Sequence, residues 1–261
     1  MTDATDPQSP PTSTTSRSGA ASTRARRQRT LSDARRALVL DAARAVFFER
    51  GLEGTSMREI AQRAGYTAGA LYSYFSSKEA IYGALLGESL QRLNARVHAA
   101  EPGSAPDPAH RLHASALAFF AFYREHPRDL DLGFYLFQGA QPRGLTPTLN
   151  AELNRQLREA LQPVQQALEA LGMEVETASA EVTSLFAHAV GVLILSHTGR
   201  IRMFRQSSQA LFERYLAQLL ARASAVQAPA RSAPMSPAAT STTVGTKVST
   251  KPSARLPGSL T

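Results

Sequence analysis

The stretch from Thr55 to Lys78 constrains the fold most strongly, because it has the pattern of short capped helices joined by a tight turn. Ser56 and Glu59 have capping-box spacing, in which a hydroxyl and a carboxylate satisfy free N–H groups of a first helical turn. The apolar residues that follow share one helical face: Met57, Ile60, Ala61 and Ala64. Gly65 comes directly after them, where a left-handed residue commonly ends a helix. We therefore predict a short helix that stops at this glycine.

A second short helix is expected directly after this turn. Thr67 is its N-cap candidate, and the helix should run from Ala68 to about Tyr74. Two helices around a three- or four-residue turn that contains glycine form a helix-turn-helix unit, whose second helix lies in the major groove of DNA. The alternative is an ordinary helical hairpin with surface hydroxyls, since short capped helices are common.

The leading end of the second helix is built from small residues, which would let its backbone approach a groove closely. The Thr67 hydroxyl could bond a base, and the methyl groups of Ala68 and Ala70 could contact thymine. We expect Tyr72, Tyr74 and Lys78 to face phosphates, so that Lys78→Ala would weaken binding to all DNA sequences alike. The full set of predicted DNA contacts is Thr55, Ser56, Arg58, Thr67, Ala68, Gly69, Ala70, Tyr72, Tyr74 and Lys78.

Two longer helices are expected on either side of this unit. The first runs from about Ser32 to Arg50, with Gly51 as its stop and an apolar stripe of Leu38, Ala42, Ala45 and Val46, with Phe47 and Phe48 nearby. The second runs from about Lys78 to Ala99, and Ser76 with Glu79 repeats the capping-box spacing at its start. Its apolar residues recur at helical spacing: Ile81, Leu85, Leu86, Leu90 and Leu93.

This region resembles the DNA-binding head of the TetR (tetracycline-repressor-like) transcriptional regulators. The matching segments are Phe47-Phe48-Glu49-Arg50-Gly51, Thr55-Ser56-Met57-Arg58-Glu59-Ile60-Ala61, Ala64-Gly65-Tyr66-Thr67 and Leu71-Tyr72-Ser73-Tyr74-Phe75-Ser76-Ser77-Lys78-Glu79. The resemblance covers about Arg35 to Leu86 and implies sequence-specific DNA binding. Many family members carry a bulkier or more polar residue in place of Ala68 and Ala70, so the operator sequence does not follow.

The net charge of +8 is concentrated at the two ends of the chain. Residues 1–37 carry seven arginines against three aspartates, and residues 222–261 carry five basic residues and no acid. The middle is therefore close to neutral, with a charge of −1. A basic arm beside a DNA-binding head is suited to contacting phosphates, and the resemblance implies the same use; a solubilising tail is the alternative.

The rest of the chain also has helical periodicity, and no period-2 strand pattern of any length is present, so we predict an all-α fold. The expected helices and apolar segments span about 110–126, 130–137, 148–171, 177–196 and 207–221. Pro163 should kink or interrupt the third of these. We divide the chain into a disordered basic arm at 1–28, a helix-turn-helix domain at 29–78, an effector-binding and dimerisation domain at 79–223, and a disordered tail at 224–261.

The segment from Thr177 to Ser196 is apolar on nearly every side, and such a helix must be buried. In a body of this size, burial often needs a second subunit. The resemblance implies a homodimer through the last two helices and a palindromic operator, because two reading helices are then about one DNA turn or more apart. A central helix in a monomeric core is the alternative.

No enzyme signature is apparent. The chain lacks cysteine, and its six histidines show no metal-ligand spacing, so we expect neither a cofactor nor a metal. No apolar leader is present, and the run from Leu185 to Leu195 is too short to span a membrane, which favours a cytoplasmic protein.

An aromatic cluster in the body could line a cavity for a hydrophobic effector, although a plain core is the alternative. The candidate effector residues are Phe119, Tyr123, Phe134, Phe137 and His188.

Two functional hypotheses remain. In the first, the resemblance implies a dimeric repressor that a small molecule releases from its palindromic operator. In the second, the body serves only for dimerisation, and DNA binding does not depend on an effector. A small helical enzyme is a third hypothesis that no residue pattern favours.

Overall fold

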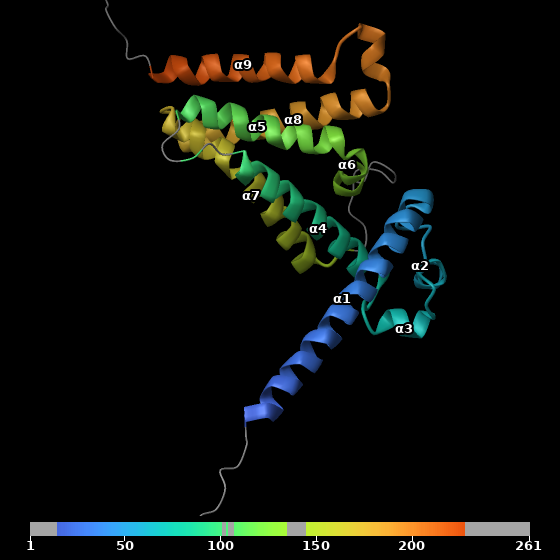
Figure 1. The fold of residues 1–261 in the computed structure, drawn as a ribbon. Helices are drawn as coiled ribbons and strands as arrows, with labels where there is room; N and C mark the ends of the chain where they lie inside the picture. The colour runs from blue at the N-terminus through green and yellow to red at the C-terminus, as the bar shows by residue number, and fades with distance from the viewer. Residues whose placement is uncertain (1–14, 101–102, 104–106, 135–144, 228–261) are drawn as a thin grey trace, which may run out of the picture. The chain divides into compact units, whose positions relative to one another are not determined.

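The computed structural model describes residues 15–100, 103, 107–134 and 145–227, all of which belong to one compact unit. Within these ranges the regular structure is helical and no strand occurs (Figure 1). This confirms the predicted all-α fold. The predicted C-terminal tail lies outside the described residues from position 228 onward, and the proposed domain boundaries stay predictions.

Three helices form the head (Figure 1): α1 (Thr15–Arg50), α2 (Met57–Ala64) and α3 (Ala68–Tyr72). The first of these begins 17 residues before the predicted start at Ser32. The prediction of a disordered arm is therefore wrong for residues 15–28, while residues 1–14 lie outside the described part. Alanine, arginine and glutamine dominate from Ala20 to Gln28, and their high helix propensity allows the packed part of α1 to propagate backwards.

The packed part of α1 begins at Val39, because every residue from 23 to 38 is exposed. Val39, Ala43 and Val46 lie on the same face of the helix and are buried, with Phe47 next to them. Leu38 is 56% exposed, so its predicted place in the core stripe is wrong, whereas Ala42 and Val46 of the same stripe are buried and Ala45 is half-buried. The exposed half of α1 extends past α2 and α3 in Figure 1.

Helix α4 (Lys78–Ala99) has the bounds predicted from the sequence. Its N-cap is Ser77, whose Oγ accepts a hydrogen bond from the Ala80 backbone N–H at 3.2 Å, so the predicted cap at Ser76 is off by one residue. The predicted apolar face is confirmed, since all five of its residues are buried. Through this face α4 packs on α1 and on the helices of the body.

The body consists of α4 and the helices that follow it: α5 (Pro108–Glu125), α6 (Pro127–Phe134), α7 (Pro147–Ala170), α8 (Val175–His197), a short 3-10 helix η1 (Arg200–Phe204) and α9 (Ser208–Gln227). Helix α7 is continuous through Pro163, which is buried, so the expected interruption is not observed. Buried residues on both sides, Ala160 and Val164, pack this turn into the core. Helix α9 continues past the predicted end at residue 221.

Aromatic rings join the helices of the body. Phe120 of α5 stacks on Phe212 of α9 with centroids 4.2 Å apart, and Phe119 meets Phe186 of α8 edge to face at 6.0 Å. Helix α8 is long and apolar enough to span a membrane by length and composition alone. Its buried residues pack against α5, α7 and α9, but only 33% of its most apolar stretch is buried within the described chain, so one copy does not give the full burial expected from the sequence.

Candidate nucleic-acid interface

The start of α2 is fixed by the predicted capping box. The Ser56 hydroxyl accepts from the Glu59 backbone N–H at 3.3 Å, and the Glu59 carboxylate accepts from the Ser56 N–H at 2.9 Å. The end of the helix is Gly65, with φ of 75°, whose N–H bonds back to the last turn. This left-handed conformation strongly favours glycine and turns the chain toward α3.

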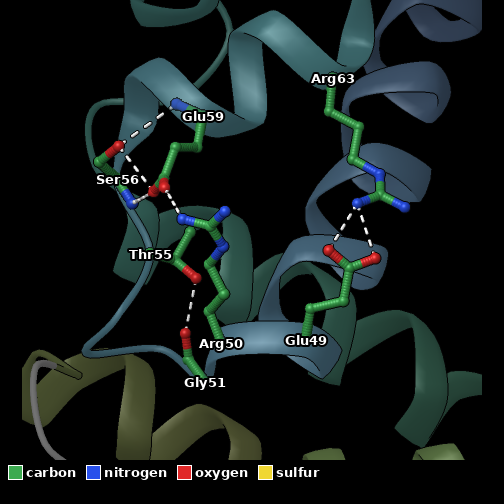
Figure 2. A network of polar contacts seen from close by, with 7 residues as sticks. All are labelled: Glu49, Arg50, Gly51, Thr55, Ser56, Glu59 and Arg63. Carbon is green, nitrogen blue, oxygen red and sulfur yellow. Dashed lines mark hydrogen bonds and ion pairs between the residues drawn. The ribbon is translucent and has the colours of Figure 1, made fainter.

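Ion pairs hold α2 against the end of α1, as Figure 2 shows. The Arg50 guanidinium binds the Glu59 carboxylate, and Arg63 binds Glu49 with an N–O distance of 2.7 Å. Hydrogen bonds from Ser56, followed by the charge of Arg50, hold the pKa of Glu59 below its ordinary value. The capping box could be predicted from the sequence, but these pairs could not, because their partners lie 9 and 14 residues apart on different helices.

Helix α3 has the N-cap predicted for it. The Thr67 Oγ1 accepts from the Ala70 backbone N–H at 3.2 Å and keeps its own proton available for donation. Thr67 and Gly69 are exposed, and a Cβ atom added at Gly69 would meet no atom within 4 Å. The helix therefore presents a leading end without bulky side chains, which its neighbours within the described residues leave open.

The opposite side of α3 anchors it in the head. Leu71 is fully buried, and Phe75 beyond the helix is 5% exposed. The Arg36 guanidinium of α1 lies 4.6 Å from the centre of the Phe75 ring, which adds a cation–π contact to the apolar packing. Because the anchor and the open end lie on different sides, α3 is fixed while its leading residues stay accessible.

Most of the predicted DNA contacts lie on the accessible side of the head. Arg58, Thr67, Gly69 and Tyr72 are exposed, with Tyr72 at 56%. Ala68, Ala70 and Tyr74 are half-buried. Ser56 is exposed, but its hydroxyl is used in the capping box, where it also donates to the Glu59 carboxylate.

Two of the predicted contacts have a different role within the structure. Thr55 is 4% exposed, and its hydroxyl donates to the Gly51 carbonyl at 2.6 Å. The Lys78 ammonium donates to the carbonyls of Leu52 and Glu53 at 2.8 and 3.3 Å. Both side chains thus stabilise the turn between α1 and α2, and neither is presented freely to a phosphate. No local sequence pattern marks the Lys78 contacts, because their partners are carbonyls 25 and 26 residues earlier.

The exposed half of α1 adds basic charge next to the reading unit. Among the residues whose side chains are described, six arginines lie there with one acid, Asp33: Arg24, Arg26, Arg27, Arg29, Arg35 and Arg36. Their partner could be a polyanion such as the DNA backbone.

A small cavity of about 170 Å³ lies in the body where α4, α5, α6 and α7 meet. Tyr123 and Phe134 line it together with leucines and two asparagines, Asn150 and Asn154. Burial, followed by the nearby Asp129, raises the pKa of Tyr123, so its hydroxyl stays protonated. The cavity offers an apolar space with a few polar groups, as effector sites commonly do.

The structure brings together only some of the candidate effector residues. Phe119 packs behind Tyr123 with ring centroids 5.3 Å apart and does not line the cavity. His188 stacks on Tyr215 of α9 at 4.3 Å, and burial lowers its pKa. Phe137 lies outside the described residues. Within the described part, no group of three or more acidic or histidine side chains could hold a metal ion.

Two family descriptions match this chain. Residues 39–85 match "Bacterial regulatory proteins, tetR family", and residues 112–219 match "Tetracyclin repressor-like, C-terminal domain". The first range contains the helix-turn-helix unit, and the second contains most of the body. Together they account for more than half of the chain.

Individual relatives match over part of the chain. The chain is 38% identical over 94 residues to the "HTH-type transcriptional repressor KstR2" of Mycobacterium tuberculosis, which is 36% of this chain and 46% of the relative. It is 38% identical over 102 residues to the "HTH-type transcriptional activator FasR" of Mycolicibacterium smegmatis, 39% of this chain and 46% of the relative. The chain thus spans about half the length of these curated relatives.

Solved structures share the fold over a longer range. A "Bacterial Regulatory Protein in the tetR Family" from Rhodococcus RHA1 superposes with a TM-score of 0.56 at 23% identity, covering 72% of this chain and 95% of the other. At this identity the comparison concerns the fold alone.

Proposed function

Because the chain belongs to the TetR family of bacterial regulatory proteins, we propose that it is a cytoplasmic, sequence-specific DNA-binding regulator that acts as a repressor. The observation that carries this proposal is the open leading end of α3, from Thr67 to Ala70, which its cap and its buried anchor hold in place. One matched relative is named a repressor and another an activator, so the sign of regulation needs its own measurement.

The leading end of α3 enters the major groove in this proposal. The Thr67 hydroxyl and the methyl groups of Ala68 and Ala70 contact base edges there. Exposed basic side chains, Arg58 on α2 and the arginines of α1, contact phosphates on either side. The phosphate contacts supply affinity that salt weakens, and the base contacts supply the sequence preference.

A homodimer forms through α8 and α9. The exposed face of α8 includes Ala180, Ala187 and Gly191, and that of α9 includes Ala210 and Ala217. Small side chains allow two helices to approach closely, and an exposed face of this kind on paired helices suits a four-helix bundle with a second copy. A two-fold dimer presents two copies of α3, and its operator is palindromic.

The body cavity is the proposed effector site, and α6 connects it to the head. Gly133 and Phe134 of α6 line the cavity. On the same helix, Asp129 pairs with Arg92 of α4, and Arg128 lies over Phe48 of α1. A hydrophobic effector larger than 170 Å³ requires α6 or α7 to move. It releases DNA only if it binds the conformation without DNA more tightly than the DNA-bound conformation.

Selection of bound sequences from random double-stranded DNA by the full chain tests the function. The proposal predicts enrichment of a palindrome whose half-sites are about one helical turn or more apart. Gel-shift titration of that palindrome against a scrambled duplex should then show sequence preference at physiological salt. Absence of any enriched sequence would contradict the proposal.

Effector release is tested separately, by a thermal-shift screen of the full chain with hydrophobic compounds. A compound that raises Tm and also releases the selected palindrome supports a ligand-released repressor. If no compound does so while the palindrome is bound, the protein is instead an effector-independent DNA-binding dimer.

A further inference from the structure

A second cavity, of about 340 Å³, lies at the junction of head and body. Its walls come from the end of α1 and the turn after it, from α4, and from the corner between α5 and α6. It shares no lining residue with the body cavity, and its volume falls within the range of small-molecule sites. We refer to it as the junction cavity.

Three aromatic rings line the junction cavity: Phe47, Phe48 and Tyr82. Phe47 and Tyr82 meet edge to face with centroids 5.9 Å apart, and both are nearly buried. The Arg128 guanidinium already lies 4.9 Å from the centre of the Phe48 ring. Electron-rich ring faces attract organic cations in this way, and several together form a cage for them.

Among the charged residues that line the junction cavity, one carboxylate and one guanidinium have no ion-pair partner within the described part of the chain: Asp131, and Arg128, whose guanidinium lies over the Phe48 ring instead. Arg44 pairs with Asp41, and Arg92 pairs with Asp129. Glu125 binds Arg96 through both carboxylate oxygens. In each of these pairs the opposite charges largely cancel, so the paired residues contribute little net charge to the cavity.

Asp131 is the remaining acid of the lining. It is half-buried and forms no ion pair within the described part of the chain. Burial raises its pKa, an effect that the charge of His197 opposes. Because this partly desolvated carboxylate lines the same cavity as the three rings, a cation that also has an apolar surface can meet both.

We propose that the junction cavity binds a small organic cation, with its charged group at Asp131 and its apolar part against Phe47, Phe48 and Tyr82. Such a ligand touches α1 and α6 at once, so it changes how the head is held on the body. This site goes beyond the proposed function, because it is separate from the effector cavity and its occupancy is measurable without DNA.

Calorimetric titration of the full chain with benzamidine, and with benzamide as a neutral compound of nearly the same shape, tests the proposal. Benzamidine should bind with a Kd below about 1 mM, and benzamide at least about tenfold more weakly. Asp131→Asn keeps the shape of the side chain and should weaken benzamidine about tenfold while leaving benzamide unchanged. The matched control is Glu174→Gln, an exposed acid at the start of α8, which should leave both affinities unchanged.

Phe48→Leu provides a second, independent variant, because it removes a ring and keeps an apolar side chain. It should weaken benzamidine several-fold, with Tm of each variant measured to establish that it folds. The proposal is overturned if benzamidine does not bind at millimolar concentration, if benzamide binds equally well, or if Asp131→Asn and Glu174→Gln have the same effect.

Discussion

Single side chains of the head divide into those available for DNA and those already bonded within the protein. Thr67 does both, because its hydroxyl oxygen caps α3 while its proton and methyl group remain available. Thr67→Ser should keep the cap and alter preference at one base pair of each half-site by about fivefold, on the order of 1 kcal/mol. Thr67→Ala should in addition destabilise the head by about 1 kcal/mol. Gel shifts measure the change in base preference, and urea unfolding measures the change in stability. If both variants behaved alike in both assays, the double role of Thr67 would be contradicted.

Lys78 and Arg58 form the second residue-scale test, since one cation is bonded internally and the other is exposed. Arg58→Ala should reduce the slope of log affinity against log salt by about 0.9 per subunit. Lys78→Ala should leave that slope nearly unchanged and destabilise the head by about 1 kcal/mol, because two carbonyls lose their donor. Salt titrations of operator binding measure the slopes. If Lys78→Ala instead reduced the salt slope, the phosphate contact that the sequence predicts for Lys78 would be supported.

Helix α2 is positioned by its capping box and by its pairs with α1, and this makes the head sensitive to acid. The pKa of Glu59 is lower in the folded protein than in the unfolded chain, so its contribution is present above pH 4.5 and is lost as pH falls through the folded pKa. Glu59→Gln should therefore reduce the dependence of unfolding free energy on pH below about 5. Urea unfolding of the full chain from pH 3 to 7 measures this, with Asp33→Asn on exposed α1 as control. An unchanged acid dependence in Glu59→Gln would contradict the assignment.

At the scale of helices, the residues that cap or end a helix could be predicted. The part of a helix that packs against no other element could not. Gly65, Thr67 and the bounds of α4 follow from local hydrogen-bond chemistry that the sequence displays. The backward extension of α1 was missed because it has no apolar stripe, and only helix propensity favours it. The role of Lys78 and the burial of Thr55 depend on contacts with the turn after α1, which no helical periodicity encodes.

At the scale of the whole molecule, α8 and α9 have an exposed face of small residues that no other element of the described chain covers. In the proposed homodimer, Ala187→Arg places a long charged side chain in this face and should leave the protein monomeric. Operator affinity should then fall by at least about tenfold, because the two half-sites are no longer bound together. Ala151→Arg, at an exposed position of α7, is the matched control. Sedimentation velocity measures the change, and a dimeric Ala187→Arg would place the interface elsewhere.

Ligand sites also depend on the arrangement of the whole molecule, so the sequence predicted them only in part. The aromatic residues of the body could be recognised in the sequence, but of the four candidate effector residues that the structure describes, Tyr123 and Phe134 line the body cavity, while Phe119 and His188 pack elsewhere. The junction cavity combines residues from the end of α1 with residues about 80 positions later on α6. Such sites arise from how helices cross, which local patterns do not specify.

The central claim is that the leading end of α3 enters the DNA groove, and Gly69 tests it most directly. Its side-chain position is exposed and open, so Gly69→Glu and Gly69→Ala should both fold and dimerise like the parent, with equal or higher Tm. Gel-shift affinity for the selected palindrome should fall at least about a hundredfold in Gly69→Glu, because a carboxylate would face the bases and phosphates, and should stay within about tenfold in Gly69→Ala. A folded, dimeric Gly69→Glu that binds the palindrome as tightly as the parent would contradict the account.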